Sequence, residues 1–347
     1  MSMQLLECTL RDGSYAIDFQ FTDKFTETFC VSLELLGFPL IEIGHGMGIG
    51  ASKNRPAAST DLEYAIAASK VLKKSHWGMF AQPGLSSLSD IRNLTETGMR
   101  FIRIGVDIDD ITVGLDLALA CHELGLDVYI NLMKSYRSSP SELADKLHIV
   151  KGCTWLAGFY LVDSAGGMLS SEISQFAEVL KETLGQNMSL GFHGHDNLGL
   201  ALSHSVDLIH RGFDLIDCTM QGLGRSSGNT NAERLVAILS RSGIDVGIDP
   251  IEVMKISESA VRPLLPVAGH SGLDTMAGFA LFHTAYMDQL IEIARYERLD
   301  PYHLMREIGT ASPKEANLES IIQKLRNENK FLTSALPKDR YIGNEQK

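Results

Sequence analysis

The sequence contains little that would suit a membrane, a nucleic acid or an oxidising compartment. No apolar run approaches the roughly 20 residues that a membrane-spanning helix needs. The opening stretch MSMQLLECTLRDG lacks the charged, apolar and small-residue zones of a secretory leader. Lys and Arg number 31 against 43 Asp and Glu, a formal net charge of −12, and no basic stripe is present to bind a phosphate backbone. We therefore expect neither a membrane protein nor a nucleic-acid-binding protein.

The five cysteines are scattered along the chain, odd in number, and free of CxxC spacing. Such cysteines are typical of reduced, buried thiols, which predicts a cytoplasmic protein without disulfides. The 347 residues are 44% hydrophobic and 21% charged, an ordinary composition for one large globular domain with a smaller one attached.

Short β-rich apolar runs alternate with amphipathic helical stretches through the first 240 or so residues. Eight strands are expected to begin at Gln4, Leu40, Trp77, Phe101, Asp127, Gly158, Ser189 and Leu215. Apolar strands separated by crossover helices indicate a parallel sheet that is buried on both faces. Eight such units match a (β/α)8 barrel, the TIM barrel of the α/β class, better than an open doubly wound sheet. The unusual polar residues also follow the strand ends, where such a barrel has its active site.

After residue 248 the strand pattern stops and only helical patterns continue. We expect helices over Pro250–Arg262, Leu273–Arg298, Pro301–Ile308 and Lys314–Asn327. The predicted organisation is therefore a catalytic barrel (1–248), an appended C-terminal helical region (249–330) and a polar, fraying tail (331–347).

The sequence GFHGHDN predicts a metal site at the end of the seventh strand. His193 and His195 are two residues apart, so on a strand their imidazoles project to the same side. The alternative is one core histidine beside one exposed histidine. Asp12, in TLRDG after the first strand, is the best third ligand, because a barrel brings the ends of strands 7, 8 and 1 together. Three ligands with open positions suit six-coordinate Mn²⁺ or Mg²⁺ better than structural zinc.

Other polar residues at the strand ends extend this predicted site. Arg11 can stabilise an oxyanion on a bound 2-oxo acid, and Arg103 is a cation that can be buried only with a partner. Ser164, in DSAGG, can hold a carboxylate, and His45 lies on the loop after the second strand. We expect Ser164, His45 and Arg103 to be the substrate-binding residues. Asn229 closes the Gly-rich loop GLGRSSGN, where it can ligate a metal or cap a helix.

Taken in order, these motifs resemble the metal-dependent TIM-barrel lyase and aldolase superfamily, whose members are hydroxymethylglutaryl-CoA lyase-like. The shared marks are T-L-R-D-G (9–13), H-x-H-x-N (193–197) and G-x-G…G-N (222–229). Within it the sequence is most similar to the 4-hydroxy-2-oxovalerate aldolase family. That branch is indicated by H-G-x-G-x-x-x-S (45–52), L-M-x-S (132–135) and D-S-x-G (163–166).

The resemblance implies a class II pyruvate aldolase that cleaves or forms a 4-hydroxy-2-oxo acid, giving pyruvate and an aldehyde. It implies a divalent ion, usually Mn²⁺ with Mg²⁺ or Co²⁺ as alternatives, on Asp12, His193 and His195. It places Arg11 at the enolate and Ser164 near the pyruvate carboxylate. It also implies docking of an acylating aldehyde dehydrogenase, and we expect a homodimer.

One position departs from the family pattern. The aldolases carry a histidine base two residues after the Gly of L-R-D-G, and here that residue is Tyr15. A tyrosine is a poor base near neutral pH, although it can relay a proton. The family also places a C-terminal tyrosine in the site, and His283, in LFHTAYM, falls close to that position. We therefore expect Tyr15 and His283 to exchange the histidine and tyrosine roles, with His283 as the base.

Three other functions have to be weighed against an aldolase. A Claisen-type acyl-CoA synthase would carry a longer regulatory domain, and a hydroxymethylglutaryl-CoA lyase would need a late loop cysteine, whereas the last cysteine here is Cys218. A scaffold protein that kept its metal site is the non-enzymatic alternative, and turnover would separate it from the enzymes.

Overall fold

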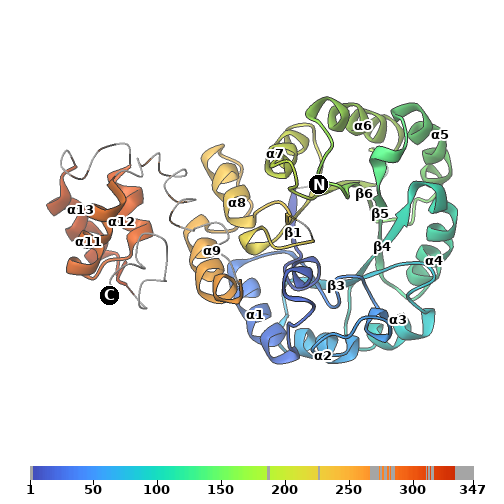
Figure 1. Ribbon diagram of the computed structural model, residues 1–347, viewed down its shortest axis with the longest axis horizontal. Helices are drawn as coiled ribbons and strands as arrows, with labels where there is room; N and C mark the ends of the chain where they lie inside the picture. The colour runs from blue at the N-terminus through green and yellow to red at the C-terminus, as the bar shows by residue number, and fades with distance from the viewer. Residues whose placement is uncertain are drawn as a thin grey trace. The chain divides into compact units, whose positions relative to one another are not determined.

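Eight parallel strands form a closed barrel in the computed structural model of the chain, seen along its axis in Figure 1. Each strand pairs with the next one in sequence, and β8 pairs back with β1. This closure confirms the predicted barrel and excludes the open doubly wound sheet. The strands are β1 (Gln4–Glu7), β2 (Leu40–Ile43), β3 (His76–Ala81), β4 (Phe101–Asp107), β5 (Asp127–Met133), β6 (Gly158–Asp163), β7 (Ser189–Gly194) and β8 (Leu215–Cys218).

The structure describes residues 3–185, 188–225, 227–265, 286–309 and 316–332, with the isolated positions 273, 276, 280, 282, 311 and 313. The chain divides into two compact units, Met1–Leu235 and Val236–Lys347. The functional division at residue 248 stays a prediction. No helix within the described residues is long and apolar enough to cross a membrane.

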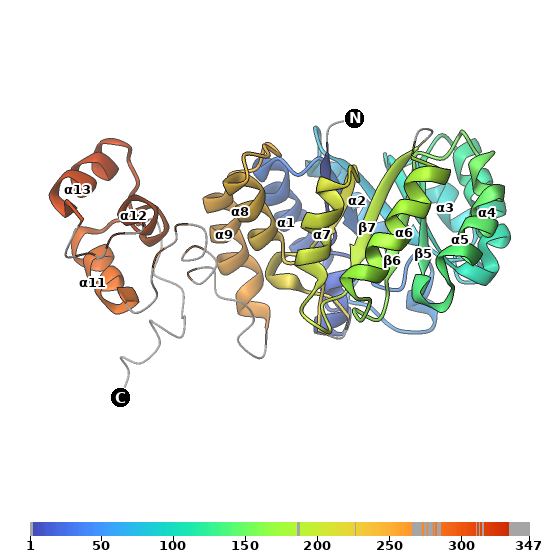
Figure 2. The ribbon, with the colours of Figure 1, turned by 90° about the horizontal axis from the view of Figure 1, so that it is seen from above.

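Helices connect the strands and surround the barrel, and Figure 2 shows them from the side. Most begin at a residue whose side chain caps the first turn, as Thr22 does for α1 and Thr60 for α2. These helices are α1 (Asp23–Leu36), α2 (Asp61–Val71), α3 (Leu88–Thr95), α4 (Ile111–Glu123), α5 (Pro140–Lys151), α6 (Ser170–Thr183) and α7 (Ala201–His210). The next helix, α8 (Ala232–Arg241), follows β8 and contains the division between the two units.

The interior of the barrel is apolar at its base and charged above. Leu6, Phe101, Tyr160 and Leu215 belong to one buried cluster inside the strands. Parallel strands buried on both faces are mostly apolar, so a charged residue inside them must have a partner. Glu42 and Arg103 are both fully buried, and their partners lie in the site described below.

The second unit is helical and has its own core. That core includes Ile251, Met254, Leu290 and Leu304. Its helices are α9 (Pro250–Ile256), which continues as a π-helix (Ser257–Val261) and a 3-10 turn (Arg262–Leu264), then α11 (Met287–Glu297), α12 (Pro301–Ile308) and α13 (Leu318–Asn327).

The helix expected over 301–308 is observed with the same bounds. The helix expected over 250–262 is observed as an α-helical, a π-helical and a 3-10 segment in succession. The last helix begins at Leu318 rather than Lys314, because the Asn317 side chain accepts a hydrogen bond from Ser320 N and caps it there. Of the expected helix over 273–298, the described continuous part is α11; most of residues 273–285, His283 included, lies outside the described residues.

Candidate active site

The barrel brings Asp12, His193 and His195 together at the C-terminal ends of β1 and β7. Asp12 opens a 3-10 helix (Asp12–Ile17) after β1, and the two histidines lie at the end of β7. All three residues are buried, and one ligand atom from each lies within 4.8 Å of the others. The distance from His193 Nε2 to Asp12 Oδ2 is 3.9 Å. A carboxylate and two imidazoles at this spacing suit a divalent metal ion.

Both imidazoles are held so that Nε2 remains available as a ligand. His193 Nδ1 donates to Asp217 Oδ2 at 2.7 Å, and His195 Nδ1 donates to the Gly228 carbonyl at 3.3 Å. Burial lowers the pKa of His195 to about 4, so this ring is neutral at pH 7, the form that binds a metal. Partners on the far nitrogen of a ligating histidine fix its orientation and raise its basicity.

Asn229 adds an amide oxygen to this group. Its Nδ2 donates to Asp12 Oδ2 at 2.5 Å, and its buried Oδ1 has no hydrogen-bond partner in the described structure. Glycines in the loop GLGRSSGN allow the Asn229 side chain to lie beside Asp12. A Cβ on Gly224 would lie 2.6 Å from the Asn229 amide, and Gly228 adopts φ +95°. An unpaired buried oxygen beside Asp12 fits a fourth metal ligand.

A buried ion network lies beneath the metal-ligand group. Arg11 Nε donates to Glu42 Oε2 at 2.5 Å and Arg11 Nη1 to Asp12 Oδ1 at 2.7 Å. Arg103 donates to both Glu42 oxygens, at 2.5 and 2.7 Å, and to Asp217. Arg103 thus has the partners that its burial requires, and Glu42 joins the two arginines.

The charges of this network do not balance without a cation. With both imidazoles in the neutral form that binds a metal, two guanidinium groups face three carboxylates, those of Asp12, Glu42 and Asp217, which leaves one surplus negative charge. Burial alone would raise the pKa of Asp12, but Arg11 and the two imidazoles outweigh it and hold that pKa below its usual range. A buried uncompensated charge is costly, so this donor set fits a divalent cation.

A cavity of about 260 Å³ opens above the network. Of the residues expected from the sequence, six line it: Arg11, Asp12, Tyr15, Ser164, His193 and His195. Asn229 and Arg103 lie outside this lining. Asn229 is bonded to Asp12 and Arg103 is paired in register with Phe80, and both of these neighbours line the cavity. Ser164 Oγ accepts from Lys134 N at 2.9 Å, which orients the hydroxyl at the rim.

His45 is buried outside the cavity lining. Its Nδ1 accepts from Met47 N at 3.1 Å, its Nε2 donates to the Arg55 carbonyl at 3.0 Å, and its ring stacks on Phe19 with centroids 4.1 Å apart. Both ring nitrogens are thus used by backbone groups, so the structure gives His45 a part in holding the loop after β2.

Tyr15 lines the cavity as a protonated phenol. Burial, and then the nearby Asp12 carboxylate, raise its pKa above the usual value, so at pH 7 its hydroxyl donates a proton rather than removing one. Its ring lies against the backbone of Gly46, where a Cβ would come within 2.8 Å of the Tyr15 and Phe19 rings.

Four further polar residues of the lining were not expected from the sequence: Gln82, Asn131, Lys134 and Arg225. Asp217, the partner of His193, was also missed. Asn131 and Asp217 are polar residues inside otherwise apolar strand stretches, a pattern that could have indicated an inward-facing site.

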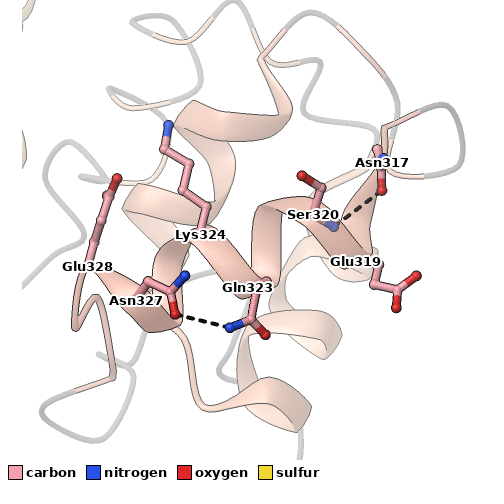
Figure 3. Close-up of a pocket in the computed structure, with 7 residues that line it drawn as sticks. All are labelled: Asn317, Glu319, Ser320, Gln323, Lys324, Asn327 and Glu328. Atoms are coloured by element: carbon pink, nitrogen blue, oxygen red, sulfur yellow. Dashed lines mark hydrogen bonds between the residues drawn. The ribbon is translucent and has the colours of Figure 1, made fainter.

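A second hollow, on α13, has a different character. Figure 3 shows that its polar side chains pair along the helix, with Gln323 Nε2 donating to Asn327 Oδ1 at 3.0 Å. Its lining contains neither histidine nor cysteine, so it offers no comparable chemistry.

Comparisons with known proteins agree with this geometry. A family model described as HMGL-like matches residues 2–260. The chain is 32% identical over 312 residues to a 4-hydroxy-2-oxovalerate aldolase of Geobacillus genomosp. 3, which covers 89% of this chain and 91% of that protein. It is 30% identical to an enzyme of the same name from Pelotomaculum thermopropionicum, over 88% and 90% of the two chains.

Solved structures show the same fold. A hydroxymethylglutaryl-CoA lyase from Pseudomonas aeruginosa superimposes with a TM-score of 0.66 at 16% identity, over 80% of this chain and 98% of that one. The carboxyl transferase domain of Rhizobium etli pyruvate carboxylase gives 0.67 at 15% identity, over 94% and 61%. With the family match over residues 2–260 and relatives named as aldolases over about nine-tenths of its length, the chain is a carbon–carbon lyase that belongs to the HMGL-like family.

Proposed function

We propose that the protein is a divalent-metal-dependent aldolase that cleaves or forms a 4-hydroxy-2-oxo acid, with pyruvate as one product. The observation that carries the proposal is the group of Asp12, His193 and His195 above a buried network with one surplus negative charge. The relatives' name supports the same reaction.

The proposed ligands are Asp12, His193 and His195, with Asn229 Oδ1 completing the protein's share. A bound divalent ion, which we take to be Mn²⁺, supplies a Lewis acid that polarises the keto group of a 2-oxo acid and stabilises the enolate. Its identity follows only from the resemblance, and Mg²⁺ and Co²⁺ are the alternatives to test.

The chain's own side chains handle the developing charge and the protons. The Arg11 guanidinium is held by Glu42 and Asp12, so it stays oriented toward an oxyanion formed on the keto oxygen of the substrate. Ser164, at the rim, binds the pyruvate carboxylate. Tyr15 donates its phenolic proton to the enolate carbon as pyruvate leaves. The proposal keeps His283 as the base that removes the 4-hydroxyl proton.

The reaction is tested by following pyruvate release from 4-hydroxy-2-oxovalerate with metal-stripped protein, before and after addition of Mn²⁺, Mg²⁺ or Co²⁺. We expect release only with a metal, and loss of release in His195→Ala. Full turnover in the metal-stripped protein, or in His195→Ala, would contradict the proposal. An unchanged rate in His283→Ala would remove that residue as the base.

The proposed partners are tested separately. An aldehyde dehydrogenase partner predicts co-purification of a dehydrogenase from native extract, and the homodimer predicts a mass near 76 kDa by light scattering, about twice the 38.0 kDa chain. A cytoplasmic location stays a prediction.

A further inference from the structure

Arg225 is a cation of the cavity lining that pairs with no carboxylate among the described residues. Three cationic side chains line the cavity, those of Arg11, Lys134 and Arg225. Arg11 is held by carboxylates of the buried network, and Lys134 Nζ pairs with Asp107 Oδ2 at 2.6 Å. The guanidinium of Arg225 therefore presents a positive charge to the cavity that no described side chain compensates.

The side chain of Arg225 is nevertheless held in place. It belongs to the Gly-rich loop after β8, and its Nη2 donates to the Ser164 carbonyl at 3.0 Å. Ser164 follows β6, and β7 lies between β6 and β8 in the closed sheet. The hydrogen bond therefore joins the loops on either side of the strand that leads to His193 and His195.

The charge of Arg225 acts on the metal-ligand group. Burial lowers the pKa of His195, and the positive charge of Arg225 lowers it further, so the guanidinium lies within electrostatic reach of this ligand. Like charges repel, so a cation at this place opposes the binding of a divalent ion. An anion bound beside both charges would compensate that repulsion, which points to a negatively charged ligand.

A carboxylate is the anion that this place fits best. A guanidinium presents its N–H groups in a planar fork that matches the two oxygens of a carboxylate. The bond to the Ser164 carbonyl uses one of these groups, and Arg225 makes no other side-chain hydrogen bond within the described structure. Ser164 Oγ accepts from Lys134 N, which leaves its own hydrogen to donate to the same carboxylate.

We propose that Arg225 binds the carboxylate of the 2-oxo acid together with Ser164, and that it selects anionic 2-oxo acids over neutral ketones. This inference rests on the proposed function, which assigns that carboxylate to Ser164. The carboxylate is present in the substrate, in the transition state and in pyruvate alike. Arg225 therefore contributes uniform binding, which lowers KM and leaves kcat nearly unchanged.

The test compares pyruvate with pyruvamide, in which a neutral amide replaces the carboxylate and the methyl ketone is kept. Kd for each ligand is measured from the broadening of its methyl NMR signal by the Mn²⁺-loaded protein. Arg225→Met keeps the length of the side chain and removes its charge. In this variant Kd for pyruvate should rise by about 10- to 100-fold, the range for a hydrogen bond between charged groups. Kd for pyruvamide should stay within about twofold of wild type.

Two further variants calibrate this result. Arg225→Lys keeps the charge but not the planar fork, so its Kd for pyruvate should lie between those of wild type and Arg225→Met. Arg137→Met is the matched control, because Arg137 is also exposed, lies 3.8 Å from its partner Asp107 and is outside the cavity lining. The control should bind both ligands as wild type does.

Kinetics separate substrate binding from a structural role. In the exchange of pyruvate methyl protons with D₂O, Arg225→Met should raise KM by the same factor as Kd and keep kcat within threefold of wild type. Equal weakening of pyruvate and pyruvamide would show that Arg225 acts only by holding its loop to the Ser164 carbonyl, and would overturn the inference. Unchanged pyruvate binding in Arg225→Met would also overturn it.

Failure of the proposed function gives a different result. If pyruvate methyl protons do not exchange with D₂O in the metal-loaded wild-type enzyme, pyruvate is not the nucleophile and both proposals fall. Exchange in the wild type, with an unchanged preference for pyruvate over pyruvamide in Arg225→Met, removes only the role of Arg225.

Discussion

Replacing Asp217 by asparagine should weaken metal binding without rearranging the site. Asp217 Oδ2 accepts from both His193 Nδ1 and Arg103, while Oδ1 has no partner in the described structure. An asparagine with its oxygen in the place of Oδ2 can keep both bonds. What the substitution removes is one negative charge next to a proposed metal ligand.

The size of the effect follows from the charges. The network has one surplus negative charge in the wild type and none in Asp217→Asn, so a divalent cation gains less by binding to the variant. A histidine backed by an amide is also a weaker ligand than one backed by a carboxylate. Mutation of such a partner lowers metal affinity by about 10- to 100-fold, which is about 1.4 to 2.7 kcal/mol less stabilisation at saturating metal.

The assay is calorimetric titration of metal-stripped protein with Mn²⁺, paired with Tm measured with and without the ion. Asp207→Asn is the matched control, because Asp207 pairs with Arg211 at the surface, where such pairs contribute about 1 kcal/mol or less. The control should bind metal as wild type does. If Asp217→Asn binds Mn²⁺ within twofold of wild type, the reasoning from the buried charges is refuted.

Three further perturbations test other parts of the site. Gly46→Ala should displace the Tyr15 ring, lower the free energy of unfolding by about 1–3 kcal/mol and lower kcat. Gly167→Ala, whose Cβ would meet no atom within 4 Å, is the control and should leave stability and kcat unchanged. Burial raises the pKa of Glu7 to about 8. The native state therefore keeps Glu7 protonated at pH values where the unfolded chain has released this proton, with a pKa near 4.3. The free energy of unfolding should thus fall as the pH rises from about 5 to 8, by up to about 1.4 kcal/mol per pH unit. In Glu7→Gln, urea titrations should show a weaker dependence of that free energy on pH. Arg11→Lys should lower kcat by about 10²- to 10³-fold while metal content, measured by elemental analysis, stays unchanged; a kcat within threefold of wild type would count against a role at the oxyanion.

The barrel could be predicted because its determinants are local. Seven of the eight strands begin at the expected residue, and β3 begins one residue earlier, at His76. Apolar strand runs, amphipathic helices and capping residues act within about ten positions of one another, so a single sequence displays them. The same holds for the histidine pair, since strand geometry alone places His193 and His195 on one side.

The parts that could not be predicted depend on contacts across the barrel. Glu42 bonds Arg11 and Arg103, which lie 31 and 61 residues away along the chain, and only the closed sheet brings the three together. Asp217 stands 24 residues after His193, and nothing local marks it as a partner. The backbone groups that use both ring nitrogens of His45 come from the folded loop after β2, which the sequence around His45 does not display.

The most direct test of the central claim is exchange of the pyruvate methyl protons with D₂O, monitored by mass spectrometry. The protein is first stripped of metal with a chelator and is then assayed with and without an added ion. The claim is that Asp12, His193 and His195 would hold a divalent ion, and that the ion would supply the Lewis acid needed for enolisation of pyruvate. It predicts deuterium incorporation with Mn²⁺ or Mg²⁺, none with metal-stripped protein, and none with His195→Ala. Incorporation that persists without metal, or no incorporation with any ion, would contradict it.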